Sequence, residues 1–251
     1  MKNFYNQGEF DVRCEWGEHG VAALAPIRDV VIVVDVLSFS TSVAIAVHNG
    51  ARVYPIRWRD ERAAEYATSI QAELAVPGRT SDGYSLAPTS LLHIPPGTRL
   101  VLPSLNGARL SLAARPLPVL AGCLRNARAV AHTAEKLGSQ IAVIAAGEGW
   151  LDDYSLRPAF EDLVGAGAII SYLGGRPSPE ALAAVAAFRA VSAGLAESLA
   201  QCSSGKELVG RGFAEDVHLA AQLNASDTAP ILLEDAFVRF VGNTAINSTP
   251  R

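Results

Sequence analysis

Polar residues follow four apolar runs in this chain, and their types suit the binding of a phosphate beside a cation. The first group comes after the β-branched run VVIVVDV and consists of Asp35, Ser38, Ser40, Thr41 and Ser42. A helix that begins at such hydroxyls offers free N–H groups and a partial positive charge to an anion. A carboxylate beside them can hold a hard cation. Simple capping of a turn and a helix by the same residue types is the alternative.

Two further groups combine glycine with a charged residue at the end of an apolar run. Asn106-Gly107, with Arg109 shortly after, follows RLVLP, and Glu148 lies between two glycines after IAVIAA. Asn-Gly forms tight turns that expose backbone N–H groups, and an arginine can grip an anion with two parallel hydrogen bonds. The alternatives are an ordinary turn for Asn106-Gly107 and a flexible connector for the Glu148 segment.

The fourth group is Glu161-Asp162, within the helical pattern FEDLVGAGAII. Neighbouring residues on a helix project in different directions, so we expect at most one of these acids to face a given site. A solvated helix face is the usual explanation for such a pair. Gly165 and Gly167 weaken the helix, which predicts that it packs closely against another backbone.

Several familiar sites are excluded by motif. The dinucleotide, P-loop and serine-hydrolase signatures do not occur in the sequence. An aspartyl-nucleophile phosphatase would need a second Asp two residues after Asp35, where this chain has Leu37. The three cysteines are far apart and form no C-x-x-C pair, so we predict neither a zinc site nor a disulfide framework.

Composition indicates a globular chain with a sizeable core. Hydrophobic residues make up 49% of the 251 residues and charged residues 18%. A net charge of -4 argues against nucleic-acid binding, which needs clustered basic surface. The polar N-terminal segment is not a signal peptide, and the run Val30 to Val34 is too short to span a bilayer. We therefore expect a cytoplasmic protein with no membrane or nucleic-acid partner.

Short apolar runs alternate with helical patterns, which predicts a layered α/β fold. Predicted strands are 30–36, 51–56, 99–104, 119–124, 141–147, 230–234 and 237–241, and predicted helices are 41–48, 60–74, 106–114, 126–137, 159–173, 179–199 and 214–223. Ser40 or Thr41 would cap the first helix. The irregular stretch 77–96 is long enough to be functional. We predict a three-layer α/β/α fold with a largely parallel or mixed sheet, as a single domain over 1–251 with a possible minor subdivision near 174–180.

Ligands of open α/β sheets gather beyond the carboxyl ends of the strands. Neighbouring strands lie about 4.8 Å apart, so loops after them can reach a common ligand. We therefore predict that Asp35, Ser40 to Ser42, Asn106-Gly107 and Glu148 line one cleft, with Glu161 or Asp162 joining them.

The ordered segments resemble the 2-phosphosulfolactate phosphatase family. The matching segments are VVIVVDVLSFSTSVAIAVHNGARVYPI, LVLPSLNGARLSLAA, LAGCLRNARAVA, IAVIAAGEG, AFEDLVGAGAII and RGFAEDVHLA. The resemblance implies a three-layer α/β/α fold particular to that family, Mg²⁺ as cofactor, and hydrolysis of a phosphate ester on a small sulfonated hydroxy acid of coenzyme M biosynthesis.

Some positions depart from the pattern that the resemblance implies. Ser38 stands where an arginine is typical, and Ala108 stands where a threonine is typical. In the loop VPGRTSDGYSLAPTS, Arg79 matches the family, but Ser85 and Pro88 replace an Asp and an Asn. Asp82 is the acid in this loop that could replace one of the missing groups. These departures predict weak activity on phosphosulfolactate itself.

Taken together, these residues predict a Mg²⁺-dependent phosphatase acting on a small phosphorylated acid. Mg²⁺ would be held by Asp35 with one or two of Glu148, Glu161 and Asp162, and catalysis would depend on Asp35, Glu148 and Glu161. Ser40, Thr41, Ser42 and Asn106-Gly107 would bind the phosphoryl oxygens, and Arg79 or Arg109 the second anionic group. The alternative is a non-catalytic anion-binding or interaction protein on the same scaffold. Two or more carboxylates beside Asp35 would favour the enzyme. A homo-oligomer stays open.

Overall fold

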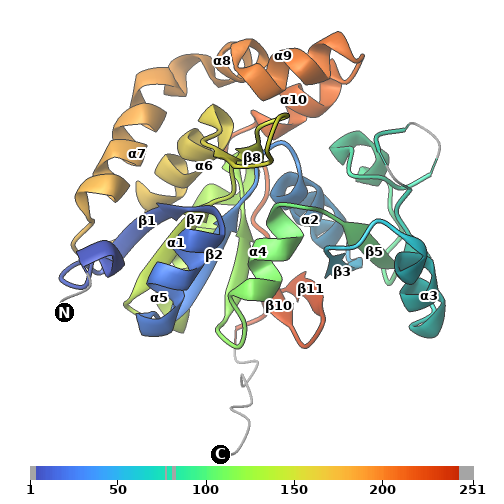
Figure 1. Ribbon diagram of the computed structural model, residues 1–251, viewed down its shortest axis with the longest axis horizontal. Helices are drawn as coiled ribbons and strands as arrows, with labels where there is room; N and C mark the ends of the chain where they lie inside the picture. Colours follow the sequence, from blue (N-terminus) through green and yellow to red (C-terminus); the bar gives the residue numbers. More distant parts are fainter. Residues whose placement is uncertain (1–3, 77, 81–82, 243–251) are drawn as a thin grey trace, which may run out of the picture.

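The computed structural model describes residues 4–76, 78–80 and 83–242. Within them, one nine-stranded sheet has the order β1-β7-β2-β6-β10-β11-β3-β5-β4 (Figure 1). Its strands are β1 Val12–Trp16, β2 Val30–Val34, β3 Arg52–Ile56, β4 Glu73–Leu74, β5 Arg99–Pro103, β6 Val119–Gly122, β7 Ile141–Ala145, β10 Pro230–Leu233 and β11 Ala236–Arg239. A separate short hairpin pairs β8 (Glu148–Gly149) with β9 (Leu156–Arg157). The predicted three-layer α/β/α class with a mixed sheet is confirmed.

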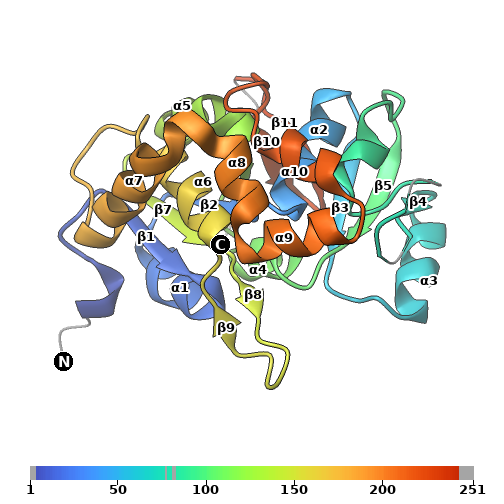
Figure 2. The ribbon, with the colours of Figure 1, turned by 90° about the horizontal axis from the view of Figure 1, so that it is seen from above.

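Helices cover both faces of the sheet. They are α1 Gly17–Leu24, α2 Phe39–His48, α3 Glu61–Ser69, α4 Gly107–Ala113, α5 Ala127–Leu137, α6 Phe160–Ile170, α7 Pro179–Val191, α8 Leu195–Gln201, α9 Ser203–Gly210 and α10 Ala214–Ala220, with short 3-10 turns at Phe4–Asn6, Ala25–Ile27, Pro88–Leu91, Leu124–Asn126 and Ser192–Gly194. Figure 2 shows α7 to α10 forming an arc across one side, while the β8–β9 hairpin projects away from the body.

Strand β2 lies between β7 and β6, and all five of its residues are buried. Val31 and Val33 pack in one core cluster with Phe39 and Leu110, on the side of α2 and α4. Val30, Ile32 and Val34 pack in the other cluster, with α5, α6 and α7. The unbroken run of β-branched residues therefore reflects a strand buried on both faces, as predicted.

The sheet consists of two parallel groups rather than one. Strands β1, β7, β2 and β6 are mutually parallel, and so are β3, β5 and β4. The antiparallel hairpin β10–β11 joins the groups through a single residue pair on each side. Our expectation that β2 and β5 end along one common parallel edge is therefore wrong, because three antiparallel pairings separate them and the two groups run in opposite directions.

Several predicted boundaries also need correction. Helix α2 begins at Phe39 with Ser38 as its N-cap residue, so Ser40 and Thr41 lie inside it. The helix expected from 60 to 74 ends at Ser69, because the segment after it pairs as β4. The long helix expected from 179 to 199 is interrupted at Ser192–Gly194, where Gly194 leaves helical geometry. Strand β1 and helices α1 and α9 were not predicted.

Segment Pro179–Gln201, which spans α7 and α8, is long enough to cross a membrane and has a mean hydropathy of 1.4. One such segment is weak evidence for a membrane span, because core helices of soluble proteins can have the same length and composition. Here α7 packs on α6 so tightly that a Cβ on Gly167 would lie 1.9 Å from the carbonyl oxygen of Ala184. The predicted close packing of the glycines in α6 is confirmed.

Candidate active site

Asp35 lies at the carboxyl end of β2, with only 7% of its surface exposed. One carboxylate oxygen accepts a hydrogen bond from the backbone N–H of Phe39 (3.1 Å), at the start of α2. The other accepts one from the N–H of Gly107 (2.9 Å), at the start of α4. Two helix starts therefore point their free N–H groups at one buried carboxylate.

Glycine is required at position 107 for this contact. A Cβ there would lie 2.2 Å from Cδ1 of Phe39 and 2.8 Å from Oδ2 of Asp35. The loop after β5 thus reaches Asp35 across the face of the sheet, through the packing of α4 on α2. Asp35 and Asn106-Gly107 meet, although their strands belong to different parallel groups.

Asp162 joins the end of β2 to the end of β7. Its Oδ1 accepts from the N–H of Val36 (2.7 Å) and its Oδ2 from the N–H of Gly147 (2.9 Å). Helix α6 can come this close because Gly165 has no side chain. A Cβ at this position would lie only 2.6 Å from Cγ2 of Val36.

Glu161 is also buried, although the sequence suggested a solvated helix face as the usual explanation for this pair of acids. It is 2% exposed, and its carboxylate accepts a hydrogen bond from the thiol of Cys202 (3.3 Å). Glu148, on β8, is partly buried, and the side chain of Asn106 lies near enough to lower its pKa against the effect of burial. Glu148 and Glu161 lie near enough to Asp35 for their charges to raise its pKa, and Asp35 lies near enough to Asp162 to do the same there.

The pKa values of three of these carboxylates, Asp35, Glu148 and Asp162, are raised. Burial and, after it, the negative charges of Glu148 and Glu161 together raise the pKa of Asp35 to about 7, although its backbone hydrogen bonds to Phe39 and Gly107 lower it. Burial, then the charges of Glu161 and Asp35, raises the pKa of Asp162 well above its usual range. Burial likewise raises the pKa of Glu148. A cation placed among them would relieve this repulsion.

The donor set fits Mg²⁺ in chemistry. Carboxylate oxygens are the ligands Mg²⁺ prefers, and each oxygen of Asp35 or Asp162 keeps an acceptor position beyond its one backbone hydrogen bond. In the described part of the chain no three acidic, His or Cys side chains converge as a complete metal centre. Mg²⁺ does not require one, because it usually keeps several waters and takes one or two carboxylates plus substrate phosphates.

The hydroxyls predicted to bind phosphate hold the backbone instead. The side chains of Ser40, Thr41 and Ser42 are fully buried. They donate to the carbonyl oxygens of Val33 (3.1 Å), Val36 (2.7 Å) and Leu86 (3.0 Å), respectively. With their protons so engaged, they fix the turn between β2 and α2.

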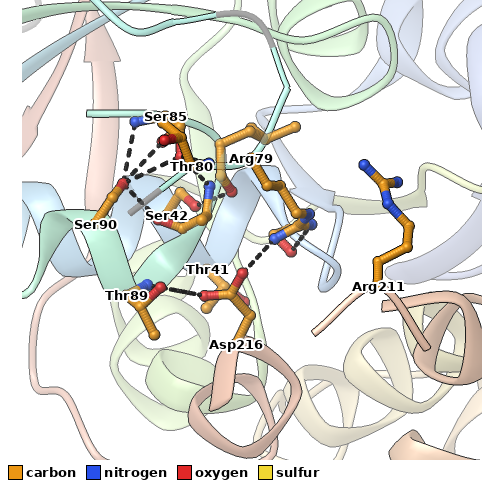
Figure 3. Close-up of polar contacts among 12 residues, drawn as sticks. Thr41, Ser42, Arg79, Thr80, Ser85, Thr89, Ser90, Arg211 and Asp216 are labelled. Atoms are coloured by element: carbon orange, nitrogen blue, oxygen red, sulfur yellow. Dashed lines mark hydrogen bonds and ion pairs between the residues drawn. The ribbon is translucent and has the colours of Figure 1, made fainter. Parts of the chain in front are cut away.

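Arg79 approaches this turn from the loop after β4 (Figure 3). One guanidinium nitrogen donates to the hydroxyl of Ser38 (2.6 Å) and another to Asp216 on α10 (2.7 Å). Asp216 is 1% exposed and also accepts from the N–H (3.0 Å) and hydroxyl (2.8 Å) of Thr89. Burial lowers the pKa of Arg79, and the charge of Asp216 opposes that shift.

A cavity of about 280 Å³ adjoins this ion pair, and three arginines line it: Arg59, Arg79 and Arg211. The guanidinium groups of Arg79 and Arg211 lie 5.8 Å and 5.9 Å from the ring centre of Phe213. Asp60 is the one acid among its described lining residues, and it is paired with Arg62 (2.6 Å). The cavity therefore suits a small anion.

Sequence reasoning missed Asp216 and Arg211. Asp216 lies within the segment RGFAEDVHLA, so the resemblance marked the region but not the residue. Arg109 was a candidate for the same role, but it forms an ion pair with Glu18 (3.0 Å), with about half of each side chain exposed. Asp82 lies outside the described residues.

Comparison with known proteins identifies the family. The family model described as 2-phosphosulpholactate phosphatase matches residues 21–235. The chain belongs to this family. A Gloeobacter violaceus protein named probable 2-phosphosulfolactate phosphatase is 30% identical over 213 residues, covering 80% of this chain and 87% of that protein. A Methanothermobacter thermautotrophicus protein named 2-phosphosulfolactate phosphatase is 30% identical, with coverage of 80% and 85%. A Carboxydothermus hydrogenoformans relative is 31% identical, with coverage of 80% and 84%.

Within the 2-phosphosulfolactate phosphatase family, this chain brings together Asp35, Glu148, Glu161, Asp162 and the N–H of Gly107. Arg79 is connected to the carboxylate cluster by its hydrogen bond to Ser38. Its positive charge and the negative charge of Asp35 attract each other. The roles of these residues in metal binding and catalysis stay predictions.

Proposed function

We propose that this protein is a Mg²⁺-dependent phosphatase that hydrolyses the phosphate ester of a small acid related to 2-phosphosulfolactate. The observation that carries the proposal is the cluster of Asp35 with three further carboxylates, which Arg79 links through Ser38 to the arginine-lined cavity. Family membership supports the reaction class.

Asp35, with either Glu148 or Asp162, would hold the metal, whose chemistry is to polarise phosphoryl oxygens and lower the pKa of bound water. The chain's own groups do the remaining work. Backbone N–H groups of Phe39 and Gly107 hold the Asp35 carboxylate in place. Glu161, buried beside the cluster, is the group available to accept a proton from an attacking water.

The arginine-lined cavity would take the second anionic group of the substrate. Arg79 cannot move freely, because Asp216 and Ser38 hold its guanidinium from two sides. A guanidinium held in this way binds a carboxylate or sulfonate with little loss of side-chain entropy. Arg211 would contribute from the end of α9.

A non-catalytic anion-binding protein on this scaffold is the second candidate. It would need only the arginine-lined cavity, and it offers no reason to gather buried like charges whose repulsion destabilises the fold. Because three carboxylates surround Asp35 rather than none, the enzyme is favoured.

Phosphate release from a panel of small phosphorylated acids, with Mg²⁺ and with EDTA, tests the proposal. We expect Mg²⁺-dependent release that Asp35→Asn abolishes and that Glu197→Gln, an exposed acid on α8, leaves unchanged. The loop substitutions predict a turnover on 2-phosphosulfolactate below about 1 s⁻¹, with faster turnover on another acid of the panel. No Mg²⁺-dependent release from any acid would contradict the proposal in favour of the binding protein.

A further inference from the structure

A second cavity, of about 560 Å³, lies among α5, the end of α2 and the loop 224–227 before β10. We call it the α5 groove and define it by His48, Arg128, His132, Thr133, Lys136, Asn224 and Asp227. None of the candidate active-site residues lines it. It therefore needs an explanation independent of the proposed phosphatase activity.

Basic side chains form a line along one side of the α5 groove. Arg128, His132 and Lys136 are exposed and spaced four residues apart, so they lie on one face of the helix. With a rise of 1.5 Å per residue, the line is about 12 Å long. His48 adds a fourth nitrogen group at the end of α2.

Acidic groups do not neutralise this line. Among the ion pairs of the described residues, none involves Arg128, His132 or Lys136. Asp227 is the one acid that lines the groove, and it is paired with Arg239 (2.9 Å). It also lies 3.8 Å from His48, whose Nδ1 contacts Thr228 (3.1 Å) and Ser226 (3.2 Å).

The side chain of Thr133 adds a polar group to the wall of the groove. Thr133 is 7% exposed, lines the groove, and makes no side-chain hydrogen bond to any part of the chain that the structure describes. The groove's loop is firmly held by contrast: Asn224 accepts from the N–H of Arg128 (2.9 Å), and the Ser226 N–H donates to the Arg125 carbonyl (2.8 Å). The groove is thus a built surface whose wall offers a hydroxyl group to a ligand.

We propose that the α5 groove binds a chain of linked phosphates. The protein as a whole carries a charge of -4, so an anion is attracted only where cations cluster locally. Charges more than about 8 Å away are largely screened at physiological salt, so the attraction of an anion to the groove depends on the groove's own cations. A single phosphate can reach only neighbouring members of the 12 Å line, about two of them, whereas linked phosphates can contact Arg128 and Lys136 together. The source is either the tail of a nucleotide or a free polyphosphate.

Isothermal titration of the whole protein in EDTA tests this, since EDTA prevents binding through a metal at the carboxylate cluster. The probes are tripolyphosphate, ATP, AMP and inorganic phosphate. We expect tripolyphosphate and ATP to bind at least about tenfold more tightly than AMP and phosphate. If ATP binds more tightly than tripolyphosphate, the groove is assigned to nucleotides. If the two bind equally, the groove is assigned to free polyphosphate.

Variants separate the groove from the rest of the surface. Arg128→Ala and Lys136→Ala should each weaken tripolyphosphate binding about fivefold, whereas Arg189→Ala, which removes an exposed cation from α7, should not. Asp35→Asn should bind as the wild type does. The proposal is overturned if tripolyphosphate fails to bind at about 5 mM, or if the two groove variants bind it as tightly as Arg189→Ala does.

Discussion

The ion pair between Arg79 and Asp216 is buried on both sides, with 8% and 0% of the two side chains exposed. Asp216→Asn keeps the size of the side chain but removes its charge. The amide oxygen can still accept from Thr89, but its NH₂ group then faces the guanidinium, donor against donor. Breaking a buried pair from one side costs about 3–5 kcal/mol, because the remaining charge stays buried without a partner. We therefore expect urea denaturation at pH 7 to show a loss of this size in the free energy of unfolding.

Two variants make the result decisive. Asp235→Asn removes the acid of an exposed pair with Arg115, 2.9 Å long and 41% and 66% exposed, and should cost no more than about 0.5 kcal/mol. Adding Arg79→Met to Asp216→Asn removes the stranded charge, so the double variant should recover about 2 kcal/mol relative to the sum of the single changes. The reasoning is refuted if Asp216→Asn costs no more than Asp235→Asn does.

Three further predictions concern the candidate active site. The pKa of Asp35, raised to about 7 by burial, means that its contribution to stability is present below pH 4 and lost as pH rises through 7. Urea denaturation in EDTA measures the free energy of unfolding at pH 5.5 and pH 8. Between these pH values the wild type should lose about 2 kcal/mol more of it than Asp35→Asn does, and equal losses would contradict this. Gly107→Ala should cost at least about 1–3 kcal/mol of stability and abolish Mg²⁺-dependent phosphate release, whereas Gly210→Ala, whose added Cβ meets nothing within 4 Å, should do neither. Arg109→Ala should leave the KM within about twofold of the wild type, because the partner of Arg109 is the exposed Glu18. A KM as high as that of Arg211→Ala would show instead that Arg109 binds the substrate.

Local pattern predicted most of the central elements, because burial on both faces of a strand leaves a run of apolar residues. Strand β1 was missed because a charged residue interrupts its apolar pattern. Arg13, in its middle, is 1% exposed, and its guanidinium donates to the carbonyl oxygens of Phe10, Asn6 and Gly8. A buried arginine satisfied in this way looks like a surface residue in the sequence.

The candidate site divides in the same manner. Asp35, Glu148 and the glycines of α6 follow from short-range pattern, since each stands at the end of an apolar run or within a helix. The use of the hydroxyls does not follow, because Ser40 to Ser42 would look the same whether they bound a ligand or the carbonyls of Val33, Val36 and Leu86. Asp216 and Arg211 both lie in the segment RGFAEDVHLA, but the resemblance marks only that region, and nothing in the sequence distinguished these two residues from surface residues.

The sequence by itself therefore determined the family, the central strands and the acids that follow two of them, because these depend on residue type and spacing along the chain. Only the tertiary structure decided that Gly107 meets Asp35 from a different parallel group, and that both Glu161 and Asp162 are buried. It also decided that Asp216 holds Arg79 beside a cavity. The physical reason is that a hydrogen bond or a pKa shift depends on what packs against a group, and residues such as 79 and 216 come together only when the whole chain has folded.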